Sequence, residues 1–170
     1  MLKARTVSCS SLHVGRAFAV VGLLLLAACD REHSPAPPVA ESYAPGLGEI
    51  MTLQQMRHIK LWFAGQSGNW QLADYEVTEL GEGFDDVVKF HPTHKDSPVA
   101  PKDAIPRLIP GPLAAVRTAI EHRDAAEFVR AYDALTAACN GCHQATNFGF
   151  NVVGRPQGNP YTNQVFEPAH

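Results

Sequence analysis

The chain has 170 residues, of which 45% are hydrophobic and 18% are charged, and its formal net charge is −3. The excess of acidic residues argues against nucleic acid as a partner, because such a partner requires a basic face. No catalytic acid–base pair or nucleophilic arrangement is visible in the sequence, so we do not predict an enzyme.

Residues 1–28 have the pattern of a bacterial lipoprotein signal peptide. Lys3, Arg5 and Arg16 precede an almost wholly apolar run over 17–28, which is too short to span a bilayer comfortably. The run ends in Leu-Ala-Ala-Cys, which resembles a lipobox, so we predict that Cys29 is lipidated and becomes the first mature residue. An ordinary signal peptide followed by an unrelated cysteine is the alternative. We therefore expect a periplasm-facing protein of the cell envelope, anchored by lipid to the inner or the outer membrane.

The mature chain divides into a tether and one domain. Residues 29–45 contain four prolines among small and polar residues, which predicts an extended tether between lipid and domain. The folded domain is expected over 46–170. Loss of the leader removes three basic residues and no acidic one, which leaves 11 basic and 17 acidic residues and a formal charge of −6.

Apolar periodicity predicts an all-α fold, a four-helix bundle with an irregular tail from about residue 144. The helices are expected over about 47–64, 70–90, 112–122 and 125–143. Six prolines between positions 91 and 112 predict that no regular helix forms there. Asp124, with Glu127 three residues later, predicts the start of the last helix. Residues 148–153 are a candidate for a short extended piece.

The last predicted helix carries a C-x-x-C-H haem-attachment motif, in which Cys139 and Cys142 are followed by His143. Each thiol can add across a haem vinyl group, and the histidine can supply an axial nitrogen to iron. The apolar stripe of this helix consists of Phe128, Tyr132, Leu135, Cys139 and Cys142. This spacing puts both cysteines on the buried face and predicts one covalent haem c inside a helical bundle. A redox disulfide and half of a zinc site are the alternatives, although no second pair of zinc ligands lies beside the motif.

Four helices with C-x-x-C-H on the last one resemble the class II c-type cytochromes, which comprise cytochrome c′ and the low-spin c-556 group. Class I cytochromes place the motif near the N-terminus and take a methionine ligand from downstream, whereas no methionine follows Cys142 here. The resemblance covers about 47–143 and rests on helix order and one motif. It implies that His143 is the proximal ligand. It also implies homodimers through the first two helices, which class II relatives often form.

The resemblance leaves the sixth iron ligand open. Low-spin class II members use a methionine on the first helix, and cytochrome c′ leaves the position free. We favour Met51, because the ligand of this family lies well before the turn to the second helix. Met56 and His58 on the same helix, or no ligand at all, are the alternatives. Met51 and His58 share one apolar face and Met56 lies on another, so periodicity does not choose between them.

The tail continues for 27 residues after the motif, which is longer than is usual in class II cytochromes. We expect it to fold back over the bundle as a strap, with Phe148 and Phe150 shielding a haem edge. Arg155 is a candidate partner for a haem propionate, with a solvated surface position as the alternative.

The leading hypothesis for function is single-electron transfer with redox partner proteins of the envelope. A second hypothesis is a haem protein that binds nitric oxide or carbon monoxide at an open sixth site. A third, without haem, is an envelope lipoprotein with a redox-active cysteine pair.

Overall fold

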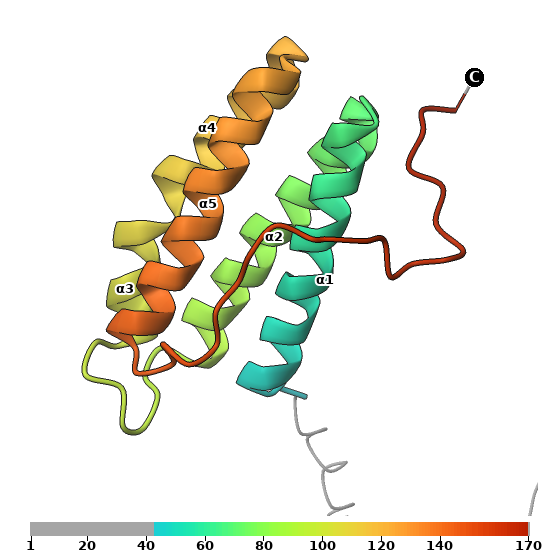
Figure 1. The fold of residues 1–170 in the computed structure, drawn as a ribbon. Helices are drawn as coiled ribbons and strands as arrows, with labels where there is room; N and C mark the ends of the chain where they lie inside the picture. The colour runs from blue at the N-terminus through green and yellow to red at the C-terminus, as the bar shows by residue number, and fades with distance from the viewer. Residues whose placement is uncertain (1–42, 170) are drawn as a thin grey trace, which may run out of the picture. The chain divides into compact units, whose positions relative to one another are not determined.

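The described part of the chain, residues 43–169 of a computed structural model, is built from helices (Figure 1). The elements are α1 (Leu47–Gln66), α2 (Trp70–Phe90), α3 (Pro101–Leu108), α4 (Pro110–His122) and α5 (Ala125–Ala145). Residues 43–169 contain no β-strand, so the predicted all-α bundle is confirmed and the expected extended piece at 148–153 is not formed. The signal peptide, the lipobox cysteine and nearly all of the tether lie outside the described residues.

The proline-rich segment after α2 contains a helix, α3, that the sequence did not predict. Pro101 opens α3, and Pro110 and Pro112 lie in the first turn of α4, where the missing N–H has no helical partner to lose. Pro106 lies inside α3, which ends two residues later. Only Ile109 separates α3 from α4, so the position of the third helix in the predicted four-helix bundle is taken by two consecutive helices. The prediction of no regular helix over 91–112 was wrong because three of its six prolines occupy first-turn positions.

α1 and α2 form an antiparallel pair with a close contact at Gly83. The side-chain amide of Gln54 on α1 donates a buried hydrogen bond of 2.8 Å to the carbonyl oxygen of Leu80 on α2. A Cβ atom at Gly83 would lie 2.2 Å from the Oε1 atom of Gln54. The absence of a side chain at this position therefore allows the two helices to approach.

Two hydrophobic clusters fill the bundle. The turn-end cluster lies where α1 meets α2 and α4 meets α5. Its buried members are Leu61, Ala64, Ala73, Val77, Leu80, Val116, Ala119, Ile120, Phe128, Ala131, Tyr132, Leu135 and Phe166. The motif-end cluster lies at the opposite end, and its buried members are Ile50, Phe84, Val87, Ile105 and Ile109. Half-buried side chains packed against the motif-end cluster include Met51, Cys139 and Cys142.

α5 starts where the sequence predicted. The Oδ1 atom of Asp124 accepts hydrogen bonds from the backbone N–H groups of Ala126 and Glu127, each at 2.9 Å. This cap satisfies two of the donors that a helix N-terminus leaves free. Phe128, one turn further on, is fully buried and lies against Gly65 of α1.

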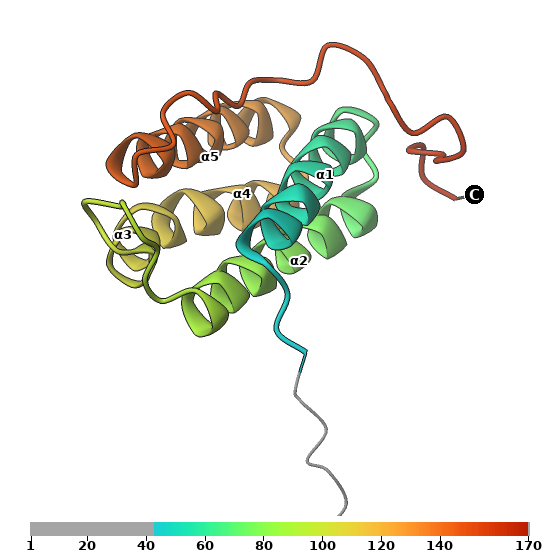
Figure 2. The same cartoon turned by 90° about the horizontal axis from the view of Figure 1, so that it is seen from below.

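The segment after α5, residues 146–169, crosses from α5 to the α1–α2 pair as a strap without regular structure (Figures 1 and 2). Figure 2 shows α5 and α1 on the side that the strap covers, with α4 and α2 below them, farther from the strap. Phe166 anchors the far end of the strap, since its buried ring lies 5.5 Å from the ring of Phe63. The side-chain amide of Asn69 also donates to the carbonyl oxygen of Glu167 at 3.3 Å. The strap therefore adds a buried aromatic side chain to the turn-end cluster.

Candidate functional site

The two motif cysteines lie on one side of the last two turns of α5. Cys139 and Cys142 are three residues apart, so their side chains are neighbours on the helix surface. Both are free thiols and are half-buried against the motif-end cluster. As expected, both cysteines lie on the inward face of α5.

Burial keeps both thiols neutral. It raises the pKa of Cys139 to about 12, and the neighbouring Cys142 adds to this shift. Burial also raises the pKa of Cys142, which the positive charge of Arg107 opposes. A reactive redox cysteine needs a lowered pKa, because the thiolate is the nucleophile. The pair therefore lacks the electrostatic activation that a redox disulfide centre requires.

One ring nitrogen of His143 is hydrogen-bonded within the protein, and the other has no hydrogen-bond partner among residues 43–169. Its Nδ1 atom lies 2.6 Å from the carbonyl oxygen of Asn151. A carbonyl oxygen can only accept, so Nδ1 is the donor, and the lone pair of the neutral imidazole is on Nε2. Nε2 has no hydrogen-bond partner among residues 43–169. Histidines that bind metal commonly have this arrangement, in which the second nitrogen donates to a carbonyl.

Asn151 reaches His143 because the chain reverses direction directly after α5. Asn147 adopts the left-handed conformation with φ of 69°, and the backbone N–H of Phe148 donates to the carbonyl oxygen of His143 at 2.7 Å. The N–H of Asn151 then donates to the carbonyl oxygen of Phe148 at 2.8 Å. Sequence reasoning missed Asn151, since it contributes its backbone and no side-chain pattern marks it.

Asn140, between the two cysteines, binds the strap through both ends of its side-chain amide. Its Nδ2 atom donates to the carbonyl oxygen of Val153 at 2.9 Å, and its Oδ1 atom accepts from the backbone N–H of the same residue at 2.8 Å. The motif and the strap are therefore joined at two neighbouring places, through Asn140 and through His143. This contact was also absent from the sequence analysis.

The methionines of the first helix lie in different surroundings. Met51 packs against the motif-end cluster, as do both motif cysteines. Met56 is half-buried and is not among the residues packed against either hydrophobic cluster. Of the two, Met51 is the one that packs against the same hydrophobic cluster as Cys139 and Cys142.

His58 lies between α1 and α5 with both ring nitrogens hydrogen-bonded. The hydroxyl of Thr136 donates to the carbonyl oxygen of Tyr132, so it accepts from Nε2–H of His58 at 2.9 Å. The Tyr132 hydroxyl lies 2.9 Å from Nδ1 and donates at 3.0 Å to the backbone carbonyl oxygen of His58. Burial lowers the pKa of His58 to about 4 and keeps the imidazole neutral. Neither nitrogen of His58 is free to bind iron in this arrangement.

Arg155 of the strap is engaged by protein groups. Its guanidinium binds both carboxylate oxygens of Asp133 on α5, and this ion pair lowers the pKa of Asp133. The guanidinium also lies over the ring of Trp62 on α1, 5.1 Å from its centroid. Arg155 thus links α5 to α1 through the strap, a structural role that the sequence analysis did not foresee.

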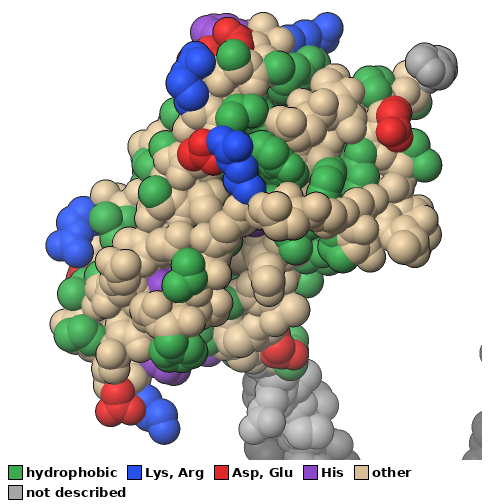
Figure 3. Space-filling model, viewed as in Figure 1, with side chains coloured by type: hydrophobic (Ala, Val, Ile, Leu, Met, Phe, Trp, Pro, Cys, Tyr) green, Lys and Arg blue, Asp and Glu red, His purple; other side chains and the backbone are tan. Residues whose placement is uncertain are grey.

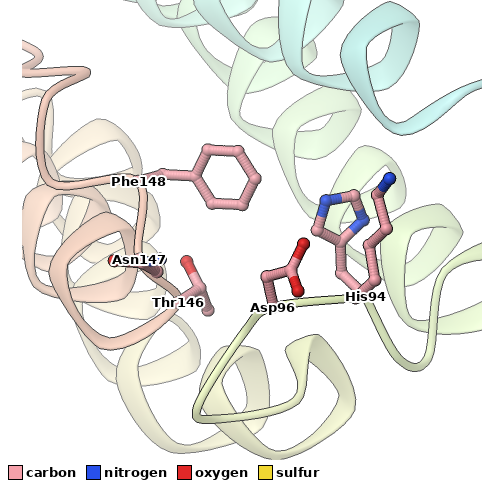
Figure 4. A pocket seen from close by; sticks show the side chains of 6 residues that line it. His94, Asp96, Thr146, Asn147 and Phe148 are labelled. Atoms are coloured by element: carbon pink, nitrogen blue, oxygen red, sulfur yellow. The ribbon is translucent and has the colours of Figure 1, made fainter.

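A small open pocket of about 230 Å³ lies beyond the end of α5 (Figure 4). It is lined by His94, Lys95, Asp96, Thr146, Asn147 and Phe148. In Figure 4 the rings of Phe148 and His94 approach from the strap and from the loop after α2, and their centroids lie 5.4 Å apart. Phe148 is half-buried, whereas Phe150 is 84% exposed. Of the two phenylalanines expected to shield a haem edge, Phe148 is therefore partly covered by neighbouring residues, whereas most of the Phe150 side chain is in solvent.

The surface that carries the strap is mostly uncharged. Figure 3 shows charged side chains scattered over this face, with no continuous basic area among the described atoms. Within residues 43–169, no helix has the length and apolar character needed to cross a membrane.

Two searches for recognisable features gave no match. Among the described residues, no three or more histidine, cysteine, aspartate or glutamate side chains form a group that could hold a metal ion. Comparison with protein-family models, curated proteins and solved structures found nothing that matches this chain.

Proposed function

We propose that the protein is a membrane-anchored c-type cytochrome that binds one covalent haem and transfers single electrons in the bacterial envelope. The observation that carries the proposal is the state of His143, whose Nδ1 is bonded to Asn151 while Nε2 keeps its lone pair. Two free thiols on the inward side of the same helix complete the set of groups that a C-x-x-C-H motif supplies. The residues present thus fit a covalently attached haem.

Each motif side chain has a distinct role in this proposal. The S–H groups of Cys139 and Cys142 would add across two vinyl groups, forming a C–S bond at one carbon and a C–H bond at the other. This addition needs no oxidant. The carbonyl oxygen of Asn151 orients the imidazole of His143 and increases the basicity of Nε2. Bound haem would supply the one-electron Fe(III)/Fe(II) couple, and the apolar motif-end cluster would limit access of water.

We propose Met51 as the sixth ligand. It packs against the same cluster as the two cysteines, whereas His58 already uses both ring nitrogens within the protein. A thioether ligand raises the reduction potential of a haem, which suits an electron carrier. The redox-pair alternative is disfavoured, because burial raises the pKa of both motif cysteines.

The proposed location depends on Cys29, which the structure does not describe. The support is the apolar run that ends in Leu-Ala-Ala-Cys. Cys29→Ser should release the protein from membranes while export continues. Retention of this variant in the membrane fraction would contradict lipid anchoring.

The main experiment is expression of the full chain in a bacterium that matures c-type cytochromes. We expect haem to stay on the polypeptide in a denaturing gel, and to be lost in the Cys139→Ala/Cys142→Ala double variant. A wild-type chain without covalent haem would contradict the proposal.

A reduced-state absorption spectrum with and without carbon monoxide then distinguishes electron transfer from gas binding. Low-spin iron that ignores the gas supports electron transfer, and high-spin iron that binds it readily supports gas binding instead.

A further inference from the structure

We infer that Asn140 is a positioning residue for His143 and that it acts through the strap. Asn140 fixes the backbone of Val153, and Val153 lies two residues from the carbonyl that accepts the Nδ1–H of His143. The inference deepens the proposed function, since it assigns the control of the proximal ligand to a residue inside the motif. Its consequences for the haem potential rest on that proposed function, whereas the positioning itself does not.

The geometry explains why one side chain can fix the carbonyl. An asparagine amide that donates to the C=O and accepts from the N–H of one residue imitates the pairing of neighbouring strands and leaves little freedom to slide. On the other side of Asn151, the backbone bonds of Phe148 and Asn151 close the turn after α5. The Asn151 carbonyl is thus held from both directions along the chain.

Other contacts of the strap do not replace this one. The next anchor is the ion pair between Arg155 and Asp133, which is largely exposed on both sides. This pair holds the strap four residues beyond Asn151 and makes no hydrogen bond to Asn151. A loss of the Asn140 bonds would therefore leave the strap attached at Arg155 and Phe166, while the Asn151 carbonyl would be held only from the side of the turn after α5.

The first test needs no haem. We would label the full chain with ¹⁵N and record the ring-nitrogen shifts of His143 in protein produced without haem. The native chain should show the Nδ1–H tautomer, and Asn140→Ala should show a mixture of tautomers. Asn159→Ala is the matched control, since the side chain of Asn159 bonds only locally, to Tyr161 of the strap. An unchanged tautomer in Asn140→Ala would overturn the inference.

The second test uses the haem-loaded protein and the reduction potential. A weaker hydrogen bond from Nδ1 makes the imidazole a poorer donor and disfavours Fe(III), so Asn140→Ala should raise the potential. We expect about a tenfold shift in the ratio of reduced to oxidised protein at fixed ambient potential, equivalent to about 59 mV for one electron. Asn159→Ala should leave the potential unchanged. A potential unchanged in Asn140→Ala, with covalent haem retained, would show that Asn140 only tethers the strap.

A second substitution tests the path through the strap. Val153→Pro removes the backbone N–H that Asn140 accepts and leaves the motif itself intact. If both changes act on the same contact, the double variant should shift the potential no further than Asn140→Ala alone. Additive shifts would mean that Asn140 and Val153 act independently and would contradict the proposed route. Loss of covalent haem in the native chain would refute the proposed function, and the tautomer measurement would still decide the positioning role.

Discussion

The imidazole ring of His58 is stacked on the phenol ring of Tyr132, with centroids 4.4 Å apart, and the Tyr132 hydroxyl is hydrogen-bonded to the Nδ1 atom and the backbone carbonyl oxygen of His58. Thr136 closes the network by accepting from Nε2–H and donating to the backbone of Tyr132. Both ring nitrogens of His58 and both hydroxyl groups of this buried set therefore have a hydrogen-bond partner. The network joins α1 to α5 one turn before the first motif cysteine.

This network predicts a pH dependence of stability. Burial lowers the pKa of His58 from 6.5 to about 4, so between these values the unfolded chain binds the proton more readily than the folded chain. The free energy of unfolding should then fall as the pH drops from about 6.5 to 4, by about 3 kcal/mol from this group. Urea unfolding at a series of pH values measures it. His58→Gln should lack this part of the slope; identical slopes in both proteins would contradict the assignment.

The strap should contribute to stability through Phe166. Its ring is 5% exposed and lies beside Phe63, so Phe166→Ala should lower the free energy of unfolding by about 3 kcal/mol. Val165 is the matched control, because it is 71% exposed and Val165→Ala should change stability by less than about 0.5 kcal/mol. Thermal and urea unfolding compare the two variants. Equal effects would show that the far end of the strap is not docked on α1.

Two glycines of α1 should respond in opposite directions to the same substitution. At Gly65 an added Cβ would lie 2.2 Å from the ring of Phe128, so Gly65→Ala should destabilise the protein by about 1–3 kcal/mol. At Gly48 an added Cβ would meet nothing within 4 Å, and Gly48→Ala should stabilise α1 by up to about 1 kcal/mol. Urea unfolding of both variants gives the two signs. Destabilisation by Gly48→Ala would contradict the open position of that residue.

The sequence predicted those features that depend on local pattern. The bounds of α2 and the cap of α5 follow from apolar periodicity and from Asp124, and the structure has both. α3 was missed because a first-turn position was considered for Pro112 and not for Pro101, which opens α3. The carbonyl of Asn151 and the bonds of Asn140 could not be foreseen, since a turn at Asn147 and the path of the strap bring them together. Such contacts depend on backbone atoms, which leave no side-chain signal.

Met51 and Met56 provide a matched pair for the sixth ligand. In haem-loaded protein, Met51→Ala should convert low-spin iron to high-spin iron and allow carbon monoxide to bind in the reduced state, because the proposed thioether ligand is removed. Met56→Ala removes the same side chain one and a half turns further along α1, outside both hydrophobic clusters, and should leave the spectrum unchanged. Absorption spectra of the two reduced variants, with and without carbon monoxide, measure the difference. A spectrum that changes in Met56→Ala and not in Met51→Ala would assign the ligand to the other face of α1. A native spectrum that is already high-spin would mean that neither methionine binds iron.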